Sequence, residues 1–153
     1  MGCDIHSFAE RKQENGAYTC VAEDVFHYRS YGLFGWLANV RNYSKLTPLT
    51  HARGLPPNMS TVGTSIYDEW GLDAHSPGYV TLEELLAVDY EQIIEDQRCT
   101  IQVGPRAWNG GATCAPGEGQ AQTLREFLGI DYFAILQQLQ QLKADRVVFW
   151  FDN

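Results

Sequence analysis

One segment near the end of the sequence restricts the fold more than any other feature. Residues 146–151 read RVVFWF, in which five consecutive side chains are β-branched or aromatic, the types that strands favour. A strand that is apolar on both faces must be covered on both faces, so it belongs inside a sheet rather than at its edge. We therefore expect this strand to have neighbours, and an N-terminal hairpin is the candidate partner.

The first 22 residues predict that hairpin. Residues 3–11 alternate in polarity, which places Asp4, His6 and Phe8 on one side of a strand and Ile5 and Ser7 on the other. Asn15-Gly16 then supplies turn chemistry, and residues 18–22, YTCVA, are typical of a returning strand.

The rest of the chain predicts helices separated by long irregular segments. A helix is predicted for residues 31–42, with Ser30 as its N-cap. Two capping boxes, Thr81 with Glu84 and Thr123 with Glu126, predict the starts of further helices. A run of apolar residues with helical period follows Asp131. Residues 99–103 favour a strand, whereas 43–67 and the glycine-rich 104–119 show no period. We expect an α+β fold in a single domain, 1–153, with a mainly antiparallel sheet packed by about three helices.

Composition excludes several partners. The 153 residues carry a net charge of −8 and a pI near 4.8, which disfavours long nucleic acids and anionic membranes. No run approaches 18 apolar residues, so we expect no membrane span. None of the four cysteines forms a C-x-x-C pair, and reduced thiols are expected. Cys3 and Cys20 are able to face each other across the hairpin, although packing is the expected role.

A basic segment stands out against this acidic background. No Asp or Glu occurs between Val25 and Tyr67, whereas several cations do. Arginine binds phosphate or carboxylate in a planar fork, and an aromatic ring stacks a base. The candidate ligand-binding residues are Arg41, Asn42, Arg53 and Trp70, with Arg106 and Trp108 from the glycine-rich loop. The alternative is that Arg41 caps a helix and that Arg53 binds the carbonyls of its own loop.

Two Asp-x-His pairs form a second candidate site. Asp4 and His6 share a strand face, and Asp73 and His75 repeat the pattern. Carboxylate oxygen and imidazole suit zinc or manganese, so the four residues predict a metal site. The alternative is a polar cluster that orients loops or a ligand. Since no complete catalytic set is visible, an enzyme is not favoured, and no cofactor is certain.

Five stretches together resemble a family of small proteins encoded by bacteriophages and prophages. They are MGCDIH, LFGWLANVRNY, RGLP, WGLDAHS and TLEELL, and the likeness covers roughly the first 90 residues. The resemblance implies no activity and transfers no role to any residue. What it implies is a setting, the cytoplasm of an infected host bacterium.

These observations predict a binding protein without turnover. Its ligand would be a small anion, most plausibly a nucleotide-derived signal that the protein sequesters to counter host antiviral defence, and a homo-oligomer is expected. One alternative is a metal-dependent phosphoesterase or nuclease that uses the two Asp-x-His pairs. Another is an acidic inhibitor that binds a host protein.

Overall fold

The C-terminal strand lies inside a four-stranded antiparallel sheet. β8 (Arg146–Asp152) pairs with β1 (Asp4–Lys12) on one side and with β3 (His75–Thr81) on the other. β2 (Tyr18–Glu23) completes the order β2-β1-β8-β3. Residues 146–151 of β8 are all buried, so the predictions of a central C-terminal strand and of an N-terminal hairpin beside it are confirmed.

This computed structural model describes residues 2–153, apart from the side chains of residues 100–103 and 106–111. In the described part of the chain there are four α-helices, and the α+β class is confirmed. The helices are α1 (Tyr31–Ala38), α2 (Thr61–Asp68), α3 (Leu82–Ala87) and α4 (Leu124–Gln141), with a 3₁₀ turn η1 (Gly71–Asp73). The remaining strands are β4 (Ile93–Asp96), β5 (Arg98–Val103), β6 (Arg106–Thr113) and β7 (Gln120–Thr123).

The chain divides into two compact units, each assembled from segments distant in sequence. The first unit contains the chain up to Arg29, Thr50–Val88 and Ile130–Asn153, and thus the four-stranded sheet. The second contains Ser30–Leu49 and Asp89–Gly129, with two small antiparallel pairs, β4 with β7 and β5 with β6. The prediction that residues 1–153 form a single domain stays a prediction.

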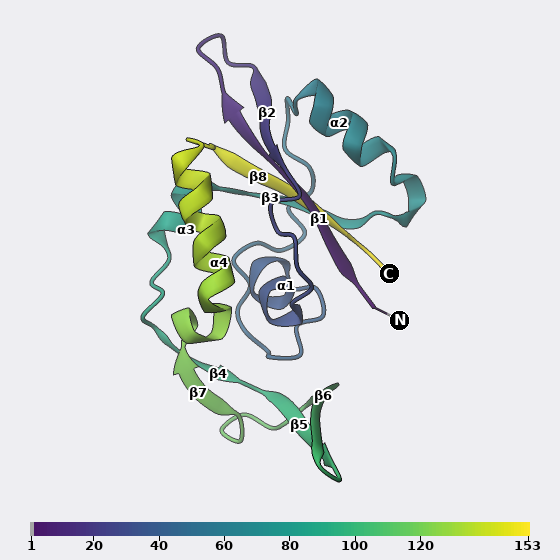
Figure 1. Cartoon of the computed structure of the whole chain (residues 1–153), viewed down its shortest axis with the longest axis vertical. Helices are drawn as coiled ribbons and strands as arrows, with labels where there is room; N and C mark the ends of the chain where they lie inside the picture. Colours follow the sequence, from purple (N-terminus) through teal and green to yellow (C-terminus); the bar gives the residue numbers. More distant parts are fainter. Residues whose placement is uncertain (1) are drawn as a thin grey trace. The chain divides into compact units, whose positions relative to one another are not determined.

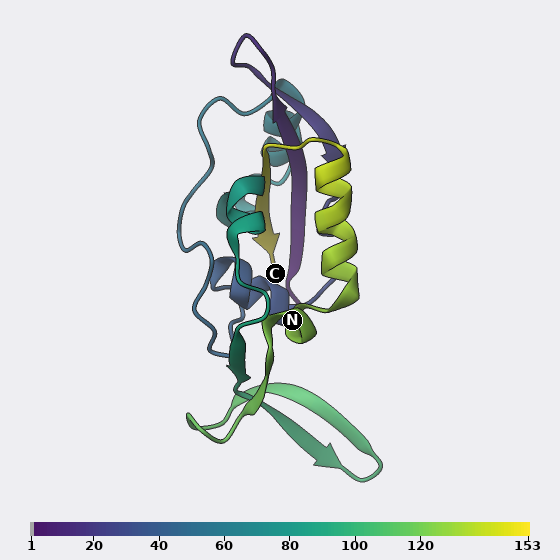
Figure 2. The ribbon, with the colours of Figure 1, turned by 90° about the vertical axis from the view of Figure 1, so that its left-hand side faces the viewer.

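Helices cover both faces of the four-stranded sheet in the first unit. In Figures 1 and 2, α2 lies on one face and the part of α4 after Gly129 lies on the other. On the α2 side, the fully buried Phe8, Val148 and Trp150 form a cluster. Ile66 of α2 packs against this cluster. The sheet therefore positions α2 through a continuous apolar contact.

Three predictions about local structure are wrong. The first helix ends at Ala38 rather than at residue 42, because Asn39 takes a left-handed conformation with φ of 61° and caps it. Residues 43–67 include all of α2 except its last residue, and residues 104–119 contain β6. Of the two readings of Cys3 and Cys20, the hairpin alternative is excluded because Cys20 pairs in register with Glu10, and Cys3 is fully buried, in line with the packing role that was expected.

Candidate functional site

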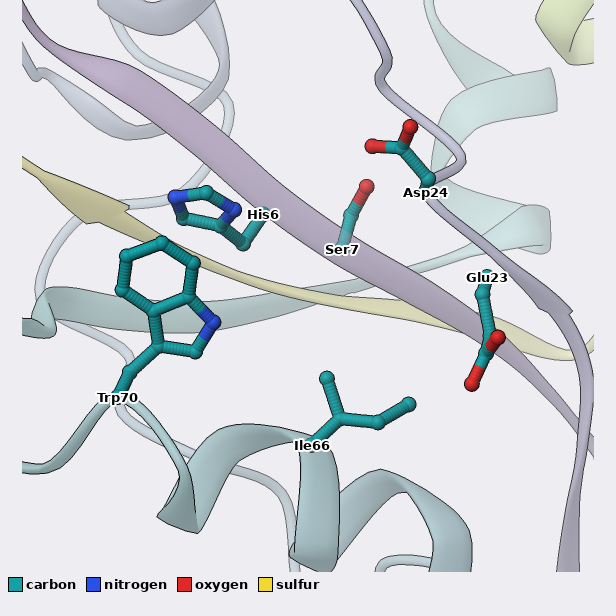
Figure 3. Close-up of a pocket in the computed structure, with 6 residues that line it drawn as sticks. All are labelled: His6, Ser7, Glu23, Asp24, Ile66 and Trp70. Carbon is teal, nitrogen blue, oxygen red and sulfur yellow. The ribbon is translucent and has the colours of Figure 1, made fainter.

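A pocket of about 270 Å³ lies in the first unit, between α2 and the strands β1 and β2. Figure 3 shows the six side chains that line it. They are His6, Ser7, Glu23, Asp24, Ile66 and Trp70. His6 and Trp70 are residues that the sequence singled out, although for two different sites, and the structure brings them together.

His6 is held from two sides. Its Nε2 atom lies 3.0 Å from Oδ2 of Asp152, and the other oxygen of that carboxylate accepts a hydrogen bond from the Asp4 N–H at 3.3 Å. The imidazole also stacks on the Trp70 indole, with ring centroids 3.8 Å apart and planes tilted by 31°. The carboxylate fixes which nitrogen of His6 is engaged, and the indole fixes the plane of the ring.

The two carboxylates of the pocket come from the end of β2. Asp24 has φ of 52°, a left-handed conformation that Asp tolerates better than most residues. Its N–H donates to the Ser7 carbonyl at 2.8 Å, and the Ser7 hydroxyl accepts from the Phe26 N–H at 2.8 Å. The chain after β2 is thus bound to β1 by backbone geometry, which leaves the exposed Glu23 and Asp24 side chains beside the pocket.

A buried ion pair anchors the start of α2. Glu10 Oε1 accepts from Arg146 Nε at 2.8 Å, and Glu10 Oε2 accepts from the Ser60 N–H at 2.6 Å. Ser60 is the N-cap of α2, since its hydroxyl accepts from the Gly63 N–H at 3.0 Å. The sheet carboxylate and the helix cap therefore share one network, which fixes where α2 and its pocket residue Ile66 lie.

The helix also approaches the sheet very closely. A Cβ atom at Gly63 would overlap the ring of Phe8, so only glycine permits this approach. Because Ile66 lies one turn later and Trp70 is the second residue after the helix, the close contact at Gly63 sets the depth of the pocket.

The four residues of the predicted metal site have different partners. Both Asp4 oxygens accept from Arg29 at 2.7 Å, and this hydrogen bonding lowers the pKa of the carboxyl. His75 stacks on Phe151 and its Nδ1 lies 3.1 Å from the Ser76 hydroxyl, whereas Asp73 ends the exposed turn η1. In the part of the chain that is described, no group of three or more His, Cys, Asp or Glu is placed to hold a metal ion. The zinc or manganese site stays a prediction without a geometric counterpart.

Arg53 binds a carboxylate of its own chain. Its guanidinium donates two hydrogen bonds to Glu84, at 2.8 and 2.9 Å, and a third to the Tyr79 carbonyl at 3.1 Å. The hydrogen bonds from Arg53 are the main cause that lowers the pKa of Glu84 to about 2. An external anion would have to compete with this bidentate pair.

Arg41 and Asn42 belong to the second unit. Arg41 lies outside the helix, with φ of 51°, and the residue at the helix C-cap is Asn39, which counts against the alternative that Arg41 caps the helix. It donates to the Tyr43 hydroxyl at 3.3 Å. The amide of Asn42 donates to Leu46 O at 2.7 Å and accepts from Leu46 N–H at 3.2 Å, which closes its own loop. The side chains of Arg106 and Trp108 lie outside the described part of the structure, so their ligand-binding roles stay predictions.

Sequence reasoning missed the acidic side of the pocket. Glu23 and Asp24 directly follow a predicted strand, and Asp152 directly follows another, so their positions at strand ends were visible. Which strand ends meet depends on the order of strands in the sheet, and one sequence does not determine that order.

Comparison with models of protein families, with curated proteins and with solved structures returned no match. None of the helices in the described residues combines the length and the apolar character that crossing a bilayer requires.

Proposed function

We propose that the protein binds a small organic cation in the pocket of its first unit and does not turn it over. The supporting observation is the lining itself. Glu23 and Asp24 are lining residues that place two carboxylates at or beside the pocket, whereas Ile66 and Trp70 contribute apolar and aromatic surface. A ligand that fits this lining has an ammonium group at one end and an apolar body at the other.

The charge of the pocket favours this ligand over an anion. The described residues that line it include no Lys or Arg, and His6 is already paired with Asp152. Carboxylates at the rim of a partly closed site attract cations and repel anions over a distance of about 10 Å. Support for the anionic ligand that the sequence predicts is weaker, because Arg53 already holds Glu84.

Binding without turnover is supported by the chemistry around His6. An imidazole with a carboxylate partner resembles two members of a hydrolytic triad, and a triad also needs a nucleophile within reach of the second ring nitrogen. Ser7, the hydroxyl residue of the pocket, uses its oxygen to accept from Phe26. The resemblance to phage proteins supports a setting in an infected bacterium, where such a protein would sequester a host molecule.

Isothermal titration with three probes of similar size tests the proposal. Benzylammonium carries the cation, benzyl alcohol is neutral, and benzoate reverses the charge. We expect benzylammonium to bind, with affinity that falls as salt rises, and the other two to bind at least about tenfold more weakly. AMP serves as the nucleotide probe.

Two double variants that carry the same net charge are compared, one as the test and one as the control. Glu23→Gln combined with Asp24→Asn removes the pocket carboxylates, and we expect benzylammonium binding to weaken by roughly 10-fold or more. Glu14→Gln combined with Glu83→Gln removes two exposed carboxylates elsewhere and should leave binding unchanged. Equal affinity in both double variants, or tighter binding of benzoate or AMP than of benzylammonium, would overturn the proposal.

A further inference from the structure

Two cysteines of the second unit lie together although neither belongs to a sequence motif. Cys99 is in β5, and Cys114 directly follows β6, the strand that pairs with β5. Both are free thiols with partly exposed side chains, and Cys99 lies near enough to contribute to the raised pKa of the Cys114 thiol. The 15-residue spacing gives no C-x-x-C signal, so the pairing arises only from the fold.

The backbone holds the two residues in place. The Cys114 N–H donates to the Gln97 carbonyl at 2.8 Å, and the Gln97 side chain donates to the Cys114 carbonyl at 3.0 Å. The β5–β6 register shifts between Arg98 and Thr100, at Cys99 itself. Because Arg98 pairs with Thr113, Cys99 and Cys114 each directly follow a paired residue, and the irregularity leaves Cys99 out of the regular ladder.

We propose that Cys99 and Cys114 form a dithiol site that undergoes thiol–disulfide exchange with a small-molecule disulfide. The site is independent of the cation pocket and uses residues of the second unit alone. Closing the bond ties β5 covalently to the end of β6 and encloses residues 100–113.

The two sulfurs have different roles in this exchange. Burial, together with the charge of Cys99 and the hydrogen bond to it, raises the pKa of the Cys114 thiol. Cys114 therefore keeps its proton, which its thiol donates to the Gln97 carbonyl at 3.3 Å, and in the proposed exchange Cys99 is the attacking thiol.

The exchange proceeds in two balanced steps. The Cys99 thiolate attacks one sulfur of the disulfide R–S–S–R, forms a mixed disulfide and releases one R–S⁻. Cys114 then loses its proton to solvent and attacks the Cys99 sulfur, which releases the second R–S⁻. Two protein thiols are oxidised to one disulfide, and one small disulfide is reduced to two thiols.

Mass spectrometry of the full chain tests the site. The reduced protein is incubated with glutathione disulfide, quenched by alkylation and analysed both intact and as peptides. We expect the loss of about two mass units and a peptide that joins Cys99 to Cys114, both reversed by dithiothreitol. Cys114→Ser should accumulate glutathione on Cys99, whereas Cys99→Ser should leave Cys114 mainly unmodified.

Cys20→Ser is the matched control, because Cys20 is also a partly exposed thiol. This variant should form the Cys99–Cys114 bond as the wild type does. The wild-type peptide map does not depend on how any variant folds. A stable mixed disulfide in the wild type without the internal bond, or a bond that involves Cys3 or Cys20, would overturn the proposal. Equal glutathionylation of the two single variants would overturn the assignment of Cys99 as the attacking thiol.

Discussion

Separating the Glu10–Arg146 pair should destabilise the protein more than any other polar substitution in the first unit. The Glu10 side chain is 0% exposed and the Arg146 side chain 6%, so neither charge has access to bulk water. The guanidinium also donates to the carbonyls of Pro57 and Asn58, at 3.1 and 3.3 Å. It lies 3.4 Å from the centre of the Tyr18 ring. Removing Glu10 leaves a buried cation with neutral partners only.

The size of the effect follows from this burial. Two unit charges about 4 Å apart attract by about 4 kcal/mol at an effective dielectric constant near 20. Removing one member of a buried pair costs about 3–5 kcal/mol in general, since the other charge stays desolvated. Because a domain is stable by only about 5–15 kcal/mol, Glu10→Leu or Arg146→Met should remove a large part of the free energy of unfolding.

Urea denaturation followed by circular dichroism measures this loss. We expect each single variant to lose about 3–5 kcal/mol, and the double variant to lose clearly less than the sum of the two, because it leaves no unpaired charge. Asp4→Asn is the control, since Asp4 and Arg29 also form a close ion pair, a bidentate one, with about half of each side chain exposed. An exposed pair contributes little, so this variant should unfold almost as the wild type does.

Two results would refute the reasoning. If Glu10→Leu costs less than about 1 kcal/mol, the pair is not desolvated in the way its burial indicates. If the losses of the single variants simply add in the double variant, the two side chains act independently, and the shared network of Glu10, Arg146 and Ser60 has no energetic meaning.

Three further predictions concern the packing and charge of single residues. Gly63→Ala should lose roughly 1–3 kcal/mol in urea denaturation and weaken benzylammonium binding, because the added methyl group meets the Phe8 ring. Gly129→Ala should lose roughly 1–3 kcal/mol without affecting binding, because φ of 80° and ψ of 173° form a region that only glycine occupies readily. Glu84→Gln should lose about 1 kcal/mol at neutral pH, given that the carboxylate is one third exposed. Since Arg53 and other hydrogen-bond donors depress the folded-state pKa of Glu84 from 4.5 to about 2, that difference from the wild type should be complete above pH 4.5 and vanish as the pH falls toward 2. Unchanged stability in either glycine variant, or a Glu84→Gln difference that persists at pH 2, would contradict the corresponding prediction.

Much of the fold was predictable because its signals are local. The alternation of β1, the apolar run of β8 and the capping box of Thr81 with Glu84 each depend on a few neighbouring residues, and the structure contains all three. By contrast, α2 was missed because its eight residues carry few apolar side chains and two prolines precede them. Its stability comes from contacts with the sheet, which no local pattern reveals.

The candidate site was less predictable because it depends on which strands are neighbours. Asp4 and His6 share a face of β1 as expected, yet each binds a residue far away in the sequence, Arg29 in one case and Asp152 in the other. The partner of His6 was determined by the β1–β8 register, in which Asp4 lies opposite Asp152. Pattern reasoning therefore identified His6 but not the carboxylate beside it.

Two kinds of residue build the pocket: some hold its shape, and others would select the ligand under the proposed function. Glu10, Arg146 and Gly63 fix α2 against the sheet, and each is buried in contacts that a substitution would break. Glu23 and Asp24 are exposed, and replacing their side chains by amides leaves the Asp24 N–H bond to Ser7 intact. The charge preference of the pocket can therefore change at little cost in stability, while its geometry cannot. For this reason the neutralised pocket should stay folded and lose its ligand, which is the combination that distinguishes a binding site from a structural cluster.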